Sequence, residues 1–574
     1  MKKFLVPLFA LALLLVFGSP AHAQTRPTKS KVAFVVDSFP SQLHRFLNGA
    51  SKVEEKLEAN AKLIEGFTKV WDGLDDSRQQ KVADLYNAAR KTKLDPMPDY
   101  VNLTQALMAY SSATVSPTIF DEWLSATTAV MTLTSKTKEL KEFIQYTSGL
   151  LEDRTLYKSR TSIWRVQNGA RFTFVPLKND IKTLFSGTVD LTYISGTGAN
   201  ADENTLYGTT GAYYFLAEAW EGSGGTLTWE RCGVSRSTCH ADLRDYSVST
   251  KLPKFTADSV TFINSNYFKS PIKGMVEESL TTKTEPDKYN FPKFRSYQKD
   301  FQLKDVLPGV DFEGNFMMYG PRFVTNDEKN PSSMIFYRGG KRFMVVNSTN
   351  FTILPHMLTT ERGAVKLYIG DDSICNAGVL VRYTTKDNRV NLINNPKRNY
   401  YSPYTDSYHQ LDIYCQSINW LIDKDVLEFS MLAQDNTITF VDFESNRYYS
   451  QSKDREVQGI DQVSPVVRMY KYMKAHDMKR DFSLVSFQKA IGMDEPQTKL
   501  MVHGLSKAGL VSFDEGTNRI HVHDKLIGFY KAIVKQEGHD YDALTLQSDT
   551  KDINAQLDLK SLDLYVHGIE KFVV

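Results

Sequence analysis

The sequence is poor in cysteine, and it lacks the short motifs of the common enzyme classes. Only four cysteines occur among 574 residues, no C-x-x-C pair is present and no histidine cluster accompanies them, which argues against a zinc site. A G-x-S-x-G elbow, an H-E-x-x-H helix, a Walker loop and a Rossmann glycine fingerprint are all missing. We therefore expect no metal and no cofactor, and a non-catalytic role is favoured over an enzymatic one.

Long apolar runs are also missing, except at the start of the chain. Lys2 and Lys3 precede the apolar stretch Phe4–Phe17, and Ala21–Ala23 fits a small-residue cleavage site. We expect residues 1–23 to be a signal peptide and the protein to be exported to the periplasm or the cell surface. No cysteine follows the cut, which argues against a lipid anchor. No later run reaches the roughly 18 apolar residues that span a bilayer, so no transmembrane span is expected in the mature chain.

The mature chain lacks net charge. Loss of the leader removes two lysines and no acids, so 69 basic residues become 67, equal to the 67 acidic residues. A neutral chain has no general electrostatic reason to bind nucleic acid, and no such partner is expected. Aromatic residues, in contrast, are abundant: 29 Tyr and 33 Phe suit β-strands and contact surfaces.

The four cysteines form two plausible pairs in an oxidising compartment. Cys232 with Cys239 would close a small ring, and Cys375 with Cys415 would join neighbouring strands. Four cysteines allow three connectivities, so the pairing rests on spacing alone. Disulfides or free buried thiols are both favoured over a metal site.

The spacing of apolar residues changes near Asp153. Before it, stripes such as Val53, Leu57, Ala61 and Ile64 predict about five helices. After it, alternating runs separated by Gly- and Asn-rich turns favour antiparallel sheets rather than βαβ units for about 300 residues.

A distinct module occupies about residues 464–535. Three helices are predicted, with Ser483 and Asp494 near the starts of the second and third, and a hairpin follows Gly509. This order resembles the winged-helix fold. The phrase Leu505-Ser506-Lys507-Ala508-Gly509-Leu510-Val511 is similar to that family's passage from recognition helix into wing. The resemblance covers about 72 residues only.

Winged-helix proteins usually bind DNA through the third helix and the wing, which implies a surface made by Gln497, Thr498, Lys499 and His503. Residues 461–535 hold twelve Lys or Arg against eight Asp or Glu, a weak footprint for a phosphate backbone. Export also separates the module from chromosomal DNA. A structural or protein-binding role is therefore favoured.

His521 and His523 alternate on a predicted strand and would face the same side. They could hold a metal if a third ligand came near, but such a pair is more often part of a polar sheet face.

These patterns predict a multidomain α+β chain with a helical N-terminal domain, a long antiparallel β-rich middle and a winged-helix-like module near the C-terminus. The expected divisions are a signal peptide at 1–23, a leader at 24–50, a helical domain at 51–153, β-rich domains at 154–300 and 301–460, the module at 461–535, and a β-rich tail at 536–574. The tail alternates like strands and lacks a polar end, which fits a final strand, the start of a further domain, or a fragment of a longer β-rich protein.

The strongest candidate binding loop lies at residues 398–409. Its tyrosines Tyr400, Tyr401, Tyr404 and Tyr408 offer contact area at low entropic cost, and Pro403 restricts the loop. Packing of these tyrosines over a sheet edge is an equally good interpretation.

The preferred function is a non-catalytic scaffold or binding component of a bacterial cell-envelope or surface assembly, with envelope or surface proteins as partners. The first alternative is a glycan-binding or glycan-cleaving exported protein, because carboxylate pairs formed in space are invisible in sequence. The second is lipid or lipopolysaccharide carriage in a β-groove. For this the phrase Ala257–Phe262, followed by Gly274, faintly resembles the strands of groove-forming bridge proteins.

Overall fold

The computed structural model describes residues 33–134, 137–167, 171–394, 402–432, 440–447, 449, 451–459, 463–534 and 544–573. The chain forms two compact units, described separately below: the first holds residues 1–156, 171–186 and 213–217, and the second holds the rest. The expected signal peptide, Tyr400 and Tyr401 lie outside the described residues.

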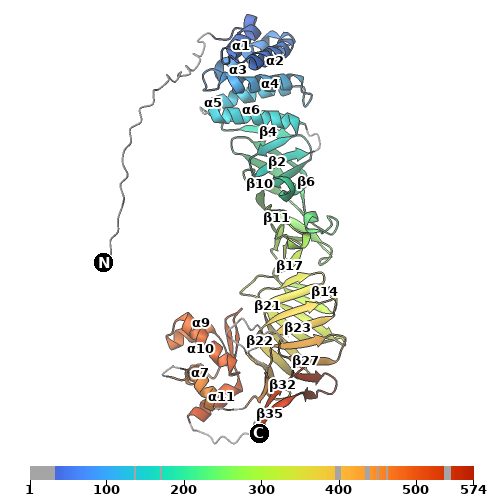
Figure 1. Ribbon diagram of the computed structural model, residues 1–574, viewed down its shortest axis with the longest axis vertical. Helices are drawn as coiled ribbons and strands as arrows, with labels where there is room; N and C mark the ends of the chain where they lie inside the picture. Colours follow the sequence, from blue (N-terminus) through green and yellow to red (C-terminus); the bar gives the residue numbers. More distant parts are fainter. Residues whose placement is uncertain are drawn as a thin grey trace, which may run out of the picture. The chain divides into compact units, whose positions relative to one another are not determined.

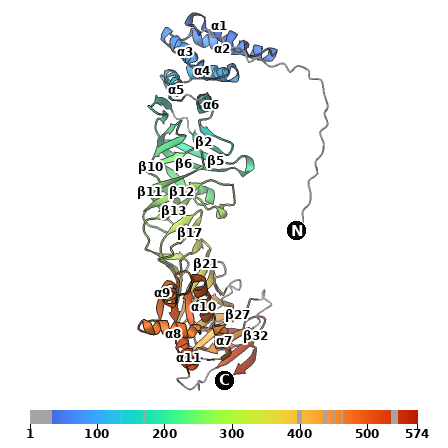
Figure 2. The ribbon, with the colours of Figure 1, turned by 90° about the vertical axis from the view of Figure 1, so that its left-hand side faces the viewer.

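The first unit is mainly helical (Figure 2) and confirms the N-terminal helical region. Its α-helices are α1 (Phe39–Asn48), α2 (Glu54–Asp72), α3 (Asp76–Ala89), α4 (Val101–Ser112), α5 (Ile119–Leu133) and α6 (Thr137–Glu152). Asp75 caps α3 by accepting a hydrogen bond from the backbone N–H of Arg78 at 2.9 Å.

Helix α1 lies in the stretch that was expected to be a leader, so the helical part starts before residue 51. The reason is aromatic packing: the ring of Phe39 is buried and stacks on Trp71 of α2 at 4.7 Å. The same unit contains the hairpin β3 (Phe172–Pro176) and β4 (Ile181–Phe185), and Glu122 of α5 accepts a hydrogen bond from the backbone N–H of Phe174 at 3.1 Å.

The second unit is dominated by antiparallel strands, as the alternating sequence pattern predicts. The strands join two hydrogen-bonded ladders, and the chain passes from one ladder to the other at successive hairpins. The first ladder contains β14 (Phe301–Leu307), β15 (Val310–Gly314), β18 (Ser332–Arg338), β19 (Lys341–Ser348), β24 (Tyr404–Asp406), β25 (Leu411–Tyr414), β28 (Phe440–Ser445), β32 (Thr545–Asp549) and β35 (Ile569–Val573).

The second ladder contains β12 (Ile272–Ser279), β13 (Lys293–Ser296), β16 (Met317–Tyr319), β17 (Arg322–Val324), β20 (Thr352–Leu354), β23 (Arg389–Ile393), β26 (Ser417–Leu421), β27 (Val426–Ser430), β33 (Ala555–Asp558) and β34 (Leu564–Val566). Aromatic side chains of the two ladders meet in a shared core. Phe312 packs edge-on against Phe323 at 4.8 Å, and Phe343 lies 4.5 Å from Trp420.

The hairpin of β21 (Met357–Ile369) and β22 (Asp372–Thr384) belongs to both ladders. The start of β21 pairs with β20, whereas its later part pairs with β19. The register shifts on either side of Gly363, where the strand changes ladder. A Cβ at this position would lie 2.7 Å from Val346 and 2.8 Å from Val381, so the crossing requires glycine.

The ladders continue through the expected domain boundary at residue 300, because β12 pairs with β13 and β13 pairs with β16. The expected β-rich tail likewise belongs to the same stack: β32 pairs with β28, and β33 pairs with β27. The 98 residues 446–543 are therefore inserted within one hairpin. Its ends meet where the Ser445 N–H donates to the Leu544 carbonyl at 2.8 Å.

The inserted segment, called the insert below, contains α7 (Gln451–Gln458), α8 (Pro465–Ala475), β29 (Asp481–Ser483), α9 (Leu484–Ile491), α10 (Glu495–Lys507), β30 (Val511–Asp514), β31 (Arg519–Val522) and α11 (Asp524–Ile533) (Figure 1). Ser483 and Asp494 cap α9 and α10 as predicted, accepting hydrogen bonds from the backbone N–H groups of Ser486 and Gln497. A core around Phe487 and Leu505 closes the insert.

The expected disulfides are absent, since all four cysteines are free. Cys232 Sγ lies 3.3 Å from the Phe291 carbonyl oxygen, whereas Cys239 Sγ lies 3.7 Å from Met318 Sδ, so the two sulfurs have different neighbours. Cys375 Sγ lies 3.3 Å from Ser373 Oγ, and Cys415 is fully buried.

None of the helices that the structure describes is long and apolar enough to cross a bilayer.

Candidate functional site

The site is built on the outward face of strands β25 and β28. Their pairing sets Ile413 opposite Phe443, and both side chains are buried in the core between the ladders. The same register sets Asp412 opposite Glu444 and Tyr414 opposite Asp442. Because side chains alternate along a strand, these polar groups share the other face of the sheet.

The insert covers this polar face and supplies the opposing charges. Lys525, at the start of α11, forms an ion pair with Asp412, and both side chains are almost completely buried. Its Nζ also lies 3.7 Å from Glu444. Lys453 of α7 forms an ion pair with Glu444 and donates a hydrogen bond to the Tyr414 hydroxyl at 2.8 Å. We call Asp412, Tyr414, Glu444, Lys453 and Lys525 the docking cluster.

Burial governs the protonation of the groups around this cluster. Burial raises the pKa of Tyr414 well above its usual range, and the nearby Glu444 carboxylate adds to the effect. Burial also lowers the pKa of Lys453, and the positive charge of Lys525 acts in the same direction. Tyr414 is therefore a hydrogen-bond donor and acceptor at neutral pH rather than a base.

A cavity of about 250 Å³ opens beside the docking cluster, between α7, α10 and the sheet. Tyr414, Asp442 and Glu444 line it from the strands, Lys453 and Val457 from α7, and Gly504 from α10. The cavity thus combines charged and apolar walls, as small-molecule sites commonly do.

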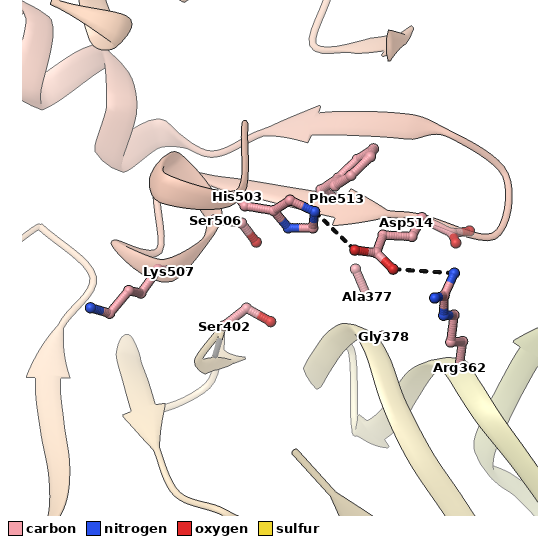
Figure 3. A pocket seen from close by; sticks show the side chains of 10 residues that line it. Arg362, Ala377, Gly378, Ser402, His503, Ser506, Lys507, Phe513 and Asp514 are labelled. Atoms are coloured by element: carbon pink, nitrogen blue, oxygen red, sulfur yellow. Dashed lines mark ion pairs between the residues drawn. The ribbon is translucent and has the colours of Figure 1, made fainter. Parts of the chain in front are cut away.

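A second contact fixes the hairpin of the insert to the sheet (Figure 3). Glu515, in the turn between β30 and β31, forms an ion pair with Arg362 of β21 at 3.2 Å and lies 2.9 Å from Nε2 of the buried His503 on α10. The adjoining cavity is only about 40 Å³, and Ser402 and Ser506 also line it. The hairpin turn is therefore held against the sheet.

The chain just after α10 also lies close to the docking cluster. Gly509 has a positive φ of 72°, and a Cβ there would lie 2.7 Å from Asp412 Oδ2. His523 contacts the Ser512 hydroxyl at 2.8 Å and the Gly509 carbonyl oxygen at 3.0 Å, and burial lowers its pKa.

The predicted tyrosine loop does not assemble as one surface in the described residues. Tyr404 is fully buried, and its hydroxyl donates to the Leu392 carbonyl at 3.2 Å, so its ring is part of the core. Tyr408 is 45% exposed beside His409. Tyr404 is therefore packed, but in the core of a strand paired on both sides rather than over a sheet edge. Tyr400 and Tyr401 lie outside the described residues.

The residues implied by the winged-helix resemblance do not form one exposed surface either. Gln497 is exposed, but Thr498 is buried and its hydroxyl donates to the Asp494 carbonyl at 2.7 Å. Lys499 pairs with Glu495 at 2.6 Å, and His503 lies in the contact with the sheet.

His521 and His523 have separate partners, since His521 pairs with Asp481 and His523 precedes α11 rather than extending the strand. Within the described ranges, no group of three or more His, Cys, Asp or Glu side chains could hold a metal ion.

The docking cluster was not predicted from the sequence. Asp412 and Lys525 are 113 positions apart, and each looks like an ordinary surface residue in its own segment. The only available sign was weak: acids and a tyrosine alternate with apolar residues on two short strands, a pattern that normally marks a solvent-facing side.

Comparison with known proteins gave no relatives. No family model, no curated protein and no solved structure matches this chain.

Proposed function

We propose that the protein is an exported, non-catalytic binding component of a bacterial cell-envelope or surface assembly. The observation that carries this proposal is the docking cluster. The buried ion pair of Lys525 with Asp412, the partly buried pair of Lys453 with Glu444 and the contact through Glu515 seat the insert on the sheet. This arrangement suits a rigid support that presents a binding module.

The exposed side of the insert supports a protein partner. Leu500 of α10 is 60% exposed and Val485 of α9 is 50% exposed, although both helices also contribute apolar side chains to the core of the insert. Exposed apolar side chains on a fixed helical surface are typical anchors for protein contacts.

Nucleic-acid binding has less support. In a winged helix the third helix and the wing would contact DNA, but here the end of α10 and the β30–β31 turn are occupied by the sheet. The turn also carries Asp514 and Glu515, which would repel phosphates.

The lipid and glycan alternatives are also less well supported. A lipid groove needs an open apolar sheet face, whereas aromatic rings fill this core, as in the stack of Phe262 on Phe294 at 4.0 Å. A glycosidase needs two carboxylates free to act as acid and base, whereas Glu444 and Glu456 on the cavity wall are already paired with Lys453 and Lys507.

Site-specific photo-crosslinking in intact cells tests this proposal. A photoreactive residue in place of Leu500 should capture one or a few defined envelope proteins. The same residue in place of Leu252, which is 51% exposed on a turn of the second unit, serves as a matched control. Identical captured proteins at both positions, or capture of glycan or lipid alone at Leu500, would contradict the proposal.

Export is tested separately by mass spectrometry of the protein from cell fractions. We expect the mature chain to begin at Gln24 and to occur outside the cytoplasm. An uncleaved chain confined to the cytoplasm would contradict this part of the proposal without affecting the binding surface.

A further inference from the structure

The cavity beside the docking cluster has more acid than its own cations neutralise. Its wall carries three carboxylates, those of Asp442, Glu444 and Glu456, and two lysines. Lys453 pairs with Glu444, and Lys507 pairs with Glu456 at 2.7 Å. Both lysines are thus already matched with an acid.

Asp442 is the carboxylate left over. Its Oδ1 accepts a hydrogen bond from the Gln547 side-chain amide at 2.9 Å, which is a neutral donor. Among the described residues, no Lys, Arg or His nitrogen lies within the 4.0 Å of an ion pair with it. The Asp442 side chain is partly buried, and burial raises its pKa, with the Glu444 charge acting in the same direction. The hydrogen bond from Gln547 and the charges of Lys453 and Lys571 oppose this shift without reversing it.

A partly desolvated carboxylate on a cavity wall is stabilised by a cation that enters the cavity. A charge-assisted hydrogen bond from an ammonium group is the strongest contact available to it. A bare metal ion fits poorly, because about 250 Å³ is far larger than one ion and no described group of three ligands surrounds it.

We infer that this cavity binds a small organic cation, namely a primary amine whose ammonium group contacts Asp442 while its carbon body lies against Val457, Gly504 and Ala508. The inference goes beyond the proposed protein-binding role and does not depend on it, since the crosslinking surface at Leu500 and the cavity wall involve different side chains.

Isothermal titration calorimetry on the full chain tests the inference with two matched pairs of probes. One pair is n-pentylammonium and 1-pentanol, and the other is glucosamine and N-acetylglucosamine. At least one amine should bind at least tenfold more tightly than its neutral counterpart. The pair that shows the difference tells whether the body of the ligand is apolar or hydroxylated.

Two variants test whether Asp442 makes the contact with the amine. Asp442→Asn keeps the size of the side chain and its hydrogen bond with Gln547, and it should weaken binding of the amine at least tenfold. Asp549→Asn changes an exposed acid on the neighbouring strand β32 and should leave binding unchanged. Circular dichroism confirms that both variants are folded.

Three results would overturn the inference. They are equal binding of amines and neutral probes, equal loss of affinity in both variants, and absence of amine binding at millimolar concentration. None of them bears on the crosslinking experiment, so the two proposals fail independently.

Discussion

At the scale of residues, buried charge is the most informative property of this protein. Besides the docking cluster, a second group lies inside the β-rich unit: Arg231 forms ion pairs with both Asp202 and Glu278, and all three side chains are buried. One guanidinium thus serves two carboxylates. The pair of acids retains an excess negative charge unless one of them takes up a proton.

Glu278 is the acid that binds this proton. Burial raises its pKa from 4.5 to about 7, although Arg231 opposes the shift. Between these two values the folded chain holds a proton that the unfolded chain has lost, so the free energy of unfolding should fall as pH rises, by about 3 kcal/mol over the window. Urea unfolding at pH 4.5, 6 and 7.5 measures this slope.

Glu278→Gln should remove most of the slope because the amide does not titrate. Glu277→Gln, on the neighbouring half-exposed acid, should keep it. A slope that is unchanged in Glu278→Gln would show that another group binds the proton.

Loss of Lys525 should be far more costly than loss of a surface lysine. Lys525→Met leaves Asp412 buried without its cation and should lower the free energy of unfolding by about 3–5 kcal/mol. Lys560→Met removes an exposed, solvent-screened ion pair with Asp425 and should cost far less. Urea unfolding of both variants gives the comparison, and similar costs would contradict the structural role of the docking cluster.

At the scale of elements, the close contact at Gly509 makes a sharp prediction. Gly509→Ala introduces a Cβ in the left-handed region and also crowds Asp412, so the insert should lose about 2–4 kcal/mol of stability. Gly492→Ala has a similar φ of 68° but no atom within 4 Å of the new Cβ, and should cost only about 1 kcal/mol. Limited proteolysis of the insert in urea measures both, and equal susceptibility would mean that Asp412 does not crowd the helix end.

The elements themselves were largely predictable from sequence, because their causes are local. Helical apolar spacing predicted α2 to α6, and the capping residues Ser483 and Asp494 predicted the starts of α9 and α10. The structure departs from the expected divisions where a segment is held by residues distant in the sequence. Helix α1 is fixed by Trp71, and the boundary at residue 300 disappears because strand pairing continues across it.

The candidate site could not be predicted for the same reason. Asp412 and Glu444 share one face only through the register of β25 and β28, and their lysines come from two helices of the insert. The tyrosine loop was detectable as composition, yet the burial of Tyr404 depends on core packing that no local pattern reports.

At the scale of the whole second unit, the insert and the sheet should be separable. The ends of the insert meet at Ser445 and Leu544, so residues 446–543 can be replaced by a short Asn-Gly turn without changing the pairing of β28 with β32. The shortened protein should fold, because the acids of the docking cluster would then face water. Circular dichroism and size-exclusion chromatography check this outcome, and an aggregated product would show that the insert is required for folding of the sheet.

The β21–β22 hairpin has a mechanical consequence. Since one continuous pair of strands is hydrogen-bonded into both ladders, the ladders cannot slide past each other without breaking that hairpin and forcing the chain through the tight crossing at Gly363. A tensile or shearing load applied to one ladder is therefore transmitted to the other at this crossing. The insert, which is anchored beside β22, keeps its orientation under that load.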